Sequence, residues 1–277
     1  MNNTEDLSGK LADIFYIPAL ILGTLFMILP VYLMFKVSVS SPQEVLTQHP
    51  TFGIQNFTLE HWKGVIQSGR LWAPLSKSFI VATGTAIISM IIAAPGAYVI
   101  SRMDRKIKYI TIISLFFTRM FPAVGIALPV SVEFIKLGLL DTNLGLILAH
   151  LIKVLPFLAW ILVGTFETIP QDLEKAASVD GASKMQILLK VVFPIALPGI
   201  AVGTMFAWLQ SWNEFTYALY MTLADKTLPL QVFYYVNRGG VFATAAYATI
   251  LTIPVAIITF FLQKYMKSGY LSGAIKG

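Results

Sequence analysis

Long apolar runs separated by short polar segments make up most of the chain. A helix needs about 20 largely apolar residues to cross the hydrocarbon core of a bilayer, and six runs reach that length. They are Ile14–Phe35, Phe79–Ile100, Tyr109–Phe134, Leu144–Phe166, Pro198–Tyr220 and Thr244–Leu262. The pattern predicts an all-α membrane protein with about six transmembrane helices.

The distribution of Lys and Arg predicts which side of the membrane each loop faces. An even number of spans places both termini on one side, and cytoplasmic loops carry an excess of basic residues. Basic residues crowd the turn after the second run and follow the last run: Arg102, Arg105, Lys106 and Lys108, and then Lys264, Lys267 and Lys276. We therefore expect both termini in the cytoplasm and two larger outer loops, at about 36–78 and 221–243.

Composition agrees with a membrane protein. Of the 277 residues, 56% are hydrophobic and 12% are charged, and the mean hydropathy is +0.73, whereas about a quarter of the residues in soluble domains are charged. The first apolar run is too long for the core of a signal peptide and has no small-residue cleavage site behind it, so we expect it to remain as a span. The chain, 1–277, is predicted to form a single transmembrane domain.

Enzymatic functions find little support in the residues present. The chain has no cysteine, which excludes thiolate chemistry, and its three histidines are too far apart for a local metal motif. An intramembrane hydrolase needs a nucleophile and a base within reach, and no such signature accompanies His150, the only histidine inside a run. We expect no catalytic residue and no metal site.

Nucleotide and nucleic-acid binding are not indicated either. No G-x-x-x-x-G-K-[ST] phosphate loop occurs in the sequence, so this chain cannot hold ATP in the usual way. The net charge of +6 comes from basic residues scattered at the ends of apolar runs, which fits a cytoplasmic-face bias better than a nucleic-acid surface.

The polar segment between the fourth and fifth runs has the pattern of two short helices joined by a turn. Asp172 and Glu174 place negative charge near the N-terminus of the first helix, and Gly181 ends it. Ser183, with Gln186 three positions later, has the spacing of a capping box for the second helix. The apolar stripe of this segment is too shallow for a protein core, so we expect a protein partner to contact it. An ordinary amphipathic loop is the alternative.

The stretch EKAASVDGAS, at 174–183, resembles the cytoplasmic coupling loop, or EAA loop, of ABC-importer permeases. Ala176, Ala177, Asp180 and Gly181 match the pattern of that loop. Four further stretches extend the resemblance to the maltose-type carbohydrate uptake family: LGLILAH at Leu144–His150, WNEF at Trp212–Phe215, TLPLQVF at Thr227–Phe233 and SGYLSGAIKG at Ser268–Gly277. The chain is therefore identified as a member of that family, with a cytoplasmic two-helix coupling loop at about 167–197.

The resemblance implies a transmembrane subunit of an ATP-driven, binding-protein-dependent importer of oligosaccharides that works by alternating access. It implies no cofactor in this chain, with ATP and Mg²⁺ on a partner ATPase dimer. The other implied partners are a homologous permease that completes a heterodimer, an extracytoplasmic sugar-binding protein and membrane lipids, without nucleic acid. The implied location is the cytoplasmic (inner) membrane of a bacterium or archaeon. A permease for another small solute is the rival within this class, whereas an ion channel or secondary transporter would not require a coupling loop.

One residue of the coupling loop departs from the family pattern. The residues implied to couple the permease to the ATPase are Glu174, Lys175, Ala176, Ala177, Asp180 and Gly181. Lys175 stands where the family usually has Glu, the residue implied to meet the ATPase. Either Glu174 substitutes from the adjacent position, or the surface of the partner is altered in charge.

Polar and aromatic residues inside the runs are candidates for the substrate path, because ionisable groups in a membrane are costly and are usually functional or paired. The candidates are Arg119, His150, Lys153, Trp208, Trp212, Asn213 and Glu214. Either Glu214 pairs with Arg119 or Lys153 and holds the bundle together, or these polar groups and the indoles line a path for sugar. Pairing is favoured for Arg119, and the path for Asn213 and Glu214. A cationic path through Lys153 and Arg119 would suit an acidic oligosaccharide, such as an alginate or pectin fragment.

An outer segment containing VNRGGV is similar in position to the family loop that probes the sugar cleft of the binding protein. Its candidate residues are Asn237, Arg238, Gly239 and Gly240. The two glycines would permit close approach of the backbone. A plain flexible loop is the alternative.

Overall fold

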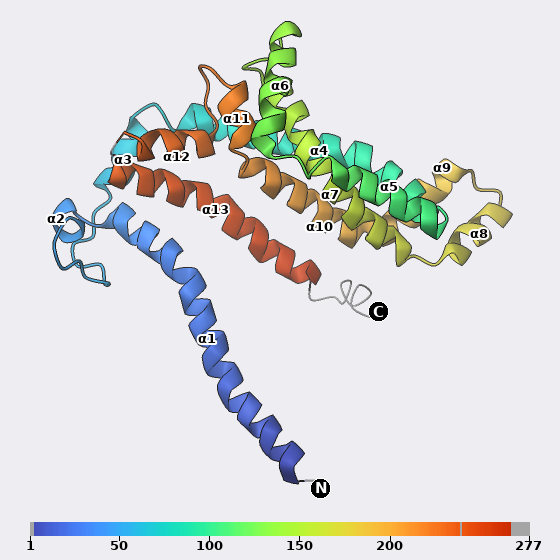
Figure 1. The fold of residues 1–277 in the computed structure, drawn as a ribbon, viewed down its shortest axis with the longest axis horizontal. Helices are drawn as coiled ribbons and strands as arrows, with labels where there is room; N and C mark the ends of the chain where they lie inside the picture. The colour runs from blue at the N-terminus through green and yellow to red at the C-terminus, as the bar shows by residue number, and fades with distance from the viewer. Residues whose placement is uncertain (1–2, 239, 267–277) are drawn as a thin grey trace. The chain divides into compact units, whose positions relative to one another are not determined.

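The computed structural model describes residues 3–238 and 240–266, and the part of the chain that it describes is helical and contains no β-strand (Figure 1). The expected all-α membrane fold is confirmed. The elements are α1 (Asn3–Val39), α2 (Pro42–Val45), α3 (Glu60–Gln67), α4 (Trp72–Ser101), α5 (Arg105–Phe117), α6 (Ala123–Lys136), α7 (Asn143–Glu167), α8 (Gln171–Val179), α9 (Lys184–Ile187), the π-helical turn η1 (Leu188–Val192), α10 (Phe193–Trp212), α11 (Thr216–Met221), α12 (Leu228–Val236) and α13 (Val241–Met266).

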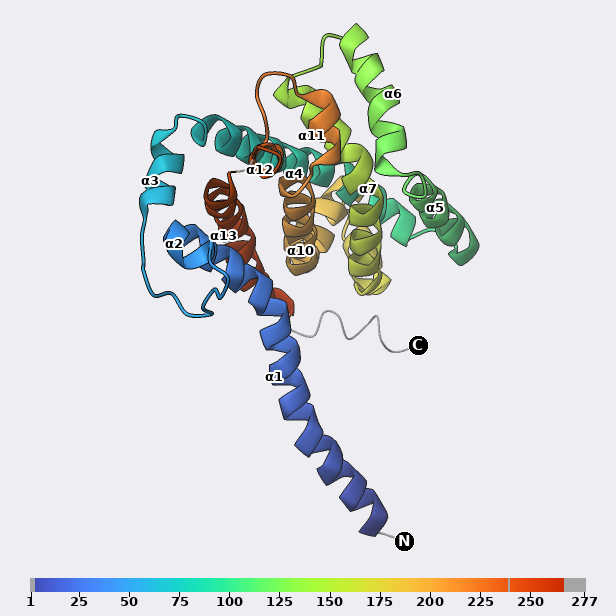
Figure 2. The ribbon, with the colours of Figure 1, turned by 60° about the vertical axis from the view of Figure 1, so that its left-hand side comes forward.

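Among the described residues, 5 helical segments are long and apolar enough to cross a membrane, and each overlaps a predicted span. They are Tyr16–Val39, Trp72–Ser101, Asn143–Glu167, Lys184–Trp212 and Val241–Phe261. The third predicted span, Tyr109–Phe134, differs from the expectation because it is divided between α5 and α6. Pro122 stands in an extended conformation between them (φ −60, ψ 137), since proline lacks an N–H donor and disfavours helix at the residue before it. Figures 1 and 2 show α6 turned away from the line of α5.

The chain divides into two compact units, and α12 and α13 each contribute residues to both. One unit contains the described residues up to Arg70 together with Val232–Ile250. The other contains Leu71–Gln231 and the described residues from Leu251 onward.

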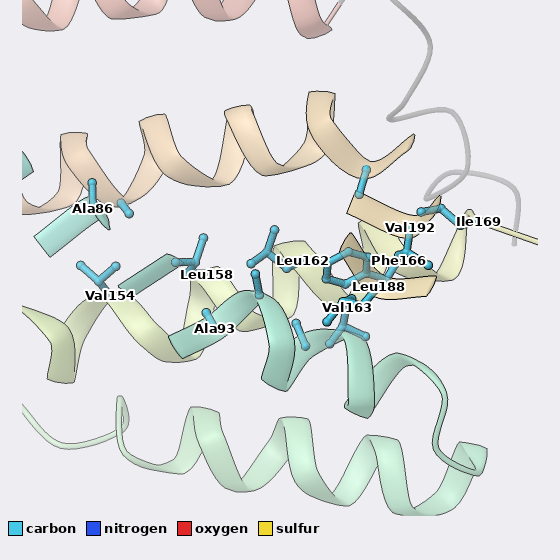
Figure 3. Packing of buried hydrophobic residues seen from close by; sticks show 14 of the residues in the cluster. Ala86, Ala93, Val154, Leu158, Leu162, Val163, Phe166, Ile169, Leu188 and Val192 are labelled. Carbon is cyan, nitrogen blue, oxygen red and sulfur yellow. The ribbon is translucent and has the colours of Figure 1, made fainter. Parts of the chain in front are cut away.

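The core of the second unit lies between α4, α7 and α10. Small residues of α4, such as Ala86 and Ala93, face larger ones of α7, such as Leu158 and Phe166, and all four are buried (Figure 3). Small residues at helix interfaces let the backbones approach closely. Such close packing drives helix association in membranes, because lipid tails are as apolar as the side chains and the hydrophobic effect therefore does not bring the helices together.

The helices α7 and α10 also pack closely against each other. The stretch GIAVG in α10 places Gly199 and Gly203 one helical turn apart, which is the small-xxx-small spacing of membrane helix contacts. A Cβ atom on Gly199 would overlap the side chain of Thr165, and one on Gly203 would lie 2.9 Å from a methyl carbon of Leu158. Gly199 is therefore required for the observed packing, and a side chain at position 203 would require Leu158 to move.

A polar network organises the first unit. The Lys36 ammonium and the Glu44 carboxylate form a buried ion pair, and Lys36 also donates to the Thr51 carbonyl. Ser40 forms an isolated antiparallel bridge with Phe57. Much of the outer loop expected at about 36–78 is therefore ordered, because it contains α2, α3 and the start of α4.

Candidate functional site

The segment between α7 and α10 forms the two-helix elbow expected from the sequence. The helix α8 ends before Gly181, whose φ of 83° is a left-handed conformation that glycine adopts without strain. Ser183 and Gln186 make the predicted capping box at the start of α9: Ser183 Oγ accepts the Gln186 N–H, and Gln186 Oε1 accepts the Ser183 N–H. From α9 the chain continues through η1 into α10 without a loop. We call α8 and α9, with the turn between them, the coupling elbow; it lies at one end of α4, α7 and α10 (Figure 1).

An ionic clamp holds the coupling elbow to the end of α4. Glu174 Oε1 accepts hydrogen bonds from Arg102 Nε (2.9 Å) and Nη2 (2.5 Å), and Glu174 Oε2 accepts one from the Tyr98 hydroxyl (2.6 Å). Arg102 also donates to the carbonyls of Phe166 (3.0 Å) and Ile169 (3.3 Å), at the end of α7. One guanidinium therefore joins α4, the C-terminus of α7 and α8.

The helix α8 has an inner and an outer face. Glu174 and Ala177, three residues apart, face inward: the Glu174 side chain is 14% exposed, and Ala177 packs against the core. Asp172 and Lys175 face outward, with side chains 87% and 72% exposed, and form an ion pair of 2.9 Å. The structure thus turns the Glu174 side chain toward the end of α4 and leaves the Lys175 side chain on the surface. The sequence reasoning missed the clamp partners Tyr98 and Arg102, although an arginine directly after an apolar run was the available signal.

A cluster of ionisable residues joins α7 to the break between α10 and α11. The Glu214 carboxylate accepts the backbone N–H groups of Thr216 (3.0 Å), Tyr217 (2.9 Å) and Ala218 (3.3 Å), and so caps α11. Its Oε1 lies 3.8 Å from the ammonium of Lys153. Of the pairs predicted for Glu214, the structure therefore brings it near Lys153.

His150 completes this cluster. Its Nδ1 lies 2.7 Å from Ser211 Oγ, within hydrogen-bond distance, and its Nε2 lies 3.6 Å from Glu214 Oε2. His150 and Glu214 are almost fully buried, whereas the Lys153 side chain is 32% exposed. The charge of Glu214 is thus stabilised by backbone donors and by the neighbouring ammonium of Lys153, as a buried carboxylate requires. The buried Nε2 of His150 has no hydrogen-bond partner among the described residues.

The other candidates for the path lie apart from this cluster. The Arg119 guanidinium lies over the ring of Phe157, 5.7 Å from its centroid. The Asn213 side chain is exposed and donates to the Leu209 carbonyl. Neither residue contacts Glu214 through a hydrogen bond or ion pair in the part of the chain that the structure describes.

The two tryptophans stack on each other. Their ring centroids lie 4.8 Å apart with planes 14° from parallel. The Trp212 side chain is buried and its indole N–H donates to the Leu251 carbonyl. Trp208 is half-buried and donates to Thr83 Oγ1. Trp208 is therefore the indole that retains an exposed edge, while Trp212 is enclosed.

Much of the segment at 221–243, which is expected to form an outer loop, is helical, because it contains α12 and the start of α13. Asn237 donates to the Phe233 carbonyl (2.8 Å), and the Arg238 guanidinium lies over the Tyr234 ring, 4.3 Å from its centroid. Both Asn237 and Arg238 are exposed, and Gly240 is partly buried. Gly239 lies outside the described residues, as does the terminal stretch at 268–277.

A further polar link, which the sequence reasoning missed, ties the turn before α7 to the segment after α11. Asp141 adopts a positive φ of 60° and its carboxylate accepts the N–H groups of Leu223 and Ala224, both at 3.1 Å. Lys77 donates to the same carboxylate at 3.4 Å. Burial tends to raise the pKa of Asp141, but these donors hold it below its ordinary value. An Asp in a short turn was the only sequence signal.

Among the described residues, no group of three or more His, Cys, Asp or Glu side chains is placed to hold a metal ion.

Known proteins similar to this chain are permeases. Residues 86–271 match the family described as binding-protein-dependent transport system inner membrane component. A putative ABC transporter permease protein of Streptomyces antibioticus is 34% identical over 203 residues, covering 72% of this chain and 89% of the relative. The diacetylchitobiose uptake system permease protein DasC of Streptomyces coelicolor is 28% identical and covers 91% and 92%. The trehalose transport system permease protein SugB of Mycobacterium tuberculosis is 30% identical and covers 79% and 82%.

The fold is also similar to that of a solved transporter. A chain in the crystal structure of a bacterial ABC transporter involved in the import of the acidic polysaccharide alginate has a TM-score of 0.77 and 25% identity, covering 93% of this chain and 97% of that chain. The family match spans more than half of the sequence and includes the coupling elbow. This chain therefore belongs to the family of inner-membrane components of binding-protein-dependent transport systems, the permease subunits of ABC transporters.

Proposed function

We propose that this chain is the transmembrane subunit of an ATP-driven, binding-protein-dependent importer of oligosaccharides and that it works by alternating access. The relatives that take up diacetylchitobiose and trehalose support a carbohydrate substrate. The chain acts as one transmembrane domain over 1–277, with both termini and the coupling elbow on the cytoplasmic side of an inner membrane.

The observation that carries this proposal is the way the coupling elbow is attached. Its first helix is clamped to α4 and to the end of α7 through Arg102, and its second helix continues into α10. The same three helices pack on one another in the core of their unit (Figure 3). A displacement of the elbow therefore reaches all three helices, because close-packed interiors transmit strain.

The energy for this displacement comes from a partner. An ATPase dimer binds ATP and Mg²⁺, receives the elbow of this chain together with that of a homologous permease, and closes on ATP binding. An extracytoplasmic sugar-binding protein delivers the substrate to the outer side. There the exposed side chains of Asn237 and Arg238 are available to contact it, and Gly239 and Gly240 would let the backbone approach.

The test is to measure coupling in the complete transporter. The chain is purified with its co-expressed neighbours in lipid nanodiscs, and the ATPase rate is recorded with a binding protein preloaded from a panel of oligosaccharides. We expect one loaded form to raise the rate over the unloaded form. An ATPase that co-purifies but responds to none of the loaded forms would contradict the carbohydrate assignment, and a preparation without any ATPase would contradict the importer function.

Lys153 favours a second candidate, in which the substrate is an acidic oligosaccharide. Its ammonium donates no hydrogen bond to any residue that the structure describes, because the nearest carboxylate, Glu214, lies at 3.8 Å and already accepts three backbone N–H groups. Arg119 lies over Phe157, one helical turn along α7 from Lys153. An ammonium with unused donors inside a span is suited to bind a carboxylate.

Matched neutral and uronate oligosaccharides separate the two candidates. If the substrate is acidic, Lys153→Gln should reduce stimulation by the uronate about tenfold or more, as expected for the loss of a buried charge pair. The same variant should reduce any response to a neutral sugar less than it reduces the response to the uronate. A wild-type transporter that ignores uronates would contradict the acidic candidate while leaving the importer function intact.

A further inference from the structure

The outer face of α8 presents a cation where the family pattern leads one to expect an anion. Lys175 occupies that position, and its side chain is 72% exposed. The adjacent carboxylate, Glu174, is not available to replace the missing anion. All three of its hydrogen bonds go to Arg102 and Tyr98, on the opposite side of the helix. Turning Glu174 outward would leave the Arg102 guanidinium, whose side chain is only 16% exposed, without its carboxylate partner, which is a costly arrangement.

The surroundings of Lys175 have the character of an interface. Val179 follows it by one helical turn and is 87% exposed, and Met185 of α9 is 62% exposed. Exposed apolar residues on a segment outside the spans indicate contact with a protein. Docking on this face would remove Lys175 from water, and a desolvated ammonium requires a partner.

Asp172 alone does not supply that partner. It accepts one hydrogen bond from the Lys175 ammonium, at 2.9 Å, and an ammonium has three donors. Bases also outnumber acids among the exposed charged residues between 171 and 190, which are Asp172, Lys175, Asp180, Lys184 and Lys190. The charge of this surface is complementary to an acidic site.

We propose that the ATPase subunit that receives the coupling elbow presents a carboxylate to Lys175, so that the ionic contact between permease and ATPase has the opposite polarity to the one implied by the family pattern. This inference rests on the proposed function only in taking an ATPase as the partner. The clamp on Glu174 and the exposure of Lys175 support it independently of the substrate.

Charge reversal at Lys175 tests the contact. The permease is co-expressed with its partner permease and ATPase, and the ATPase retained on the permease is measured across a salt titration for the wild type and for Lys175→Glu, Lys175→Met and Lys175→Arg. We expect Lys175→Glu to weaken retention at least about tenfold and Lys175→Arg to preserve it, because a like-charge contact replaces an ion pair. Lys106→Glu, at an exposed lysine in the first turn of α5, controls for a general effect of charge. A Glu→Lys or Asp→Lys substitution in the receiving cleft of the ATPase should restore binding to the Lys175→Glu permease.

If Lys175→Glu retains the ATPase as well as or better than the wild type, the cleft presents a cation and the proposal is overturned. Asp172→Asn identifies the actual contact in that case, because it then weakens retention while Lys175→Met does not. Retention requires no sugar, so a transporter that no loaded binding protein stimulates would count against the import function and leave this measurement intact.

Discussion

Lys36 and Glu44 form an ion pair that is almost completely removed from solvent. Lys36 Nζ and Glu44 Oε1 lie 3.6 Å apart, and the two side chains are 5% and 2% exposed. The Glu44 carboxylate also accepts the backbone N–H groups of Gln55 (3.1 Å) and Asn56 (2.8 Å). One carboxylate therefore holds the loop after α2 against the end of α1.

Acid should release this loop. The Asn56 N–H contributes most, with Gln55 and Lys36, to holding the pKa of Glu44 below its ordinary value of 4.5. Because the folded-state pKa is the lower one, the stabilisation is fully present above a pH of about 4.5 and is lost as the pH falls through the folded-state value. Hydrogen exchange of 45–57, corrected for the intrinsic pH dependence, should show increased opening in that range. The Glu44→Gln variant should show the opening already at neutral pH, and a wild-type-like acid transition in that variant would contradict the assignment.

Breaking the clamp between Arg102 and Glu174 should uncouple the elbow from the spans. Glu174→Gln replaces charge-assisted hydrogen bonds with weaker ones, and such bonds contribute about 1.5–3 kcal/mol. We expect faster hydrogen exchange in 171–187 and a lower yield of transport per ATP hydrolysed. Glu167→Gln is the matched control, because Glu167 pairs with Lys108 at a more exposed site, where ion pairs contribute about 0–1 kcal/mol. Equal effects of the two variants would argue against a coupling role for the clamp.

Gly199 should tolerate no side chain. Gly199→Ala places a methyl group on Thr165 at the contact between α7 and α10, and overpacking of this kind costs about 1–3 kcal/mol. We expect a lower thermal unfolding temperature in detergent. Gly164→Ala provides the comparison, since a Cβ atom there meets nothing within 4 Å. If both variants unfold at the same temperature, the packing at Gly199 is not as tight as the structure indicates.

Gly181→Pro should abolish transport while the protein still inserts into the membrane. Proline fixes φ near −65°, which is incompatible with the φ of 83° at this position, and it removes the N–H that Gly181 donates to the Ser178 carbonyl. Gly181→Asn should retain more transport, because asparagine tolerates the left-handed region better than most residues. Membrane insertion is checked by fractionation, and unchanged transport in Gly181→Pro would remove the elbow from the coupling mechanism.

The sequence was most informative where one local rule determines the structure. Apolar length located the spans, and the capping box at Ser183 and the turn at Gly181 were recognised because capping and positive φ depend on a few neighbouring residues. The span expected at Tyr109–Phe134 differed because hydropathy does not register the backbone effect of Pro122. The same length of apolar sequence can form one helix or two.

Long-range polar contacts were beyond sequence reasoning. Glu174 and Arg102 are 72 positions apart and Asp141 lies 82 positions from Leu223, so no local spacing links them. Glu214 illustrates the intermediate case: its proximity to Lys153 was among the predicted pairs, but its role as the cap of α11 depends on the exact break between two helices. Only the fold brings these groups together.

The π-helical turn η1, between the coupling elbow and α10, determines which residues of α9 and α10 share a face. Pro194 lacks the N–H that would bond to Lys190 in an α-helix, and η1 accommodates this with one extra residue per turn. One extra residue rotates everything after it by about 100° around the helix axis. Residues of α9 and α10 that would share a face on a regular α-helix are therefore offset from each other along one continuous helical segment. Substitutions can therefore change the side chains on one of these faces without changing those on the other.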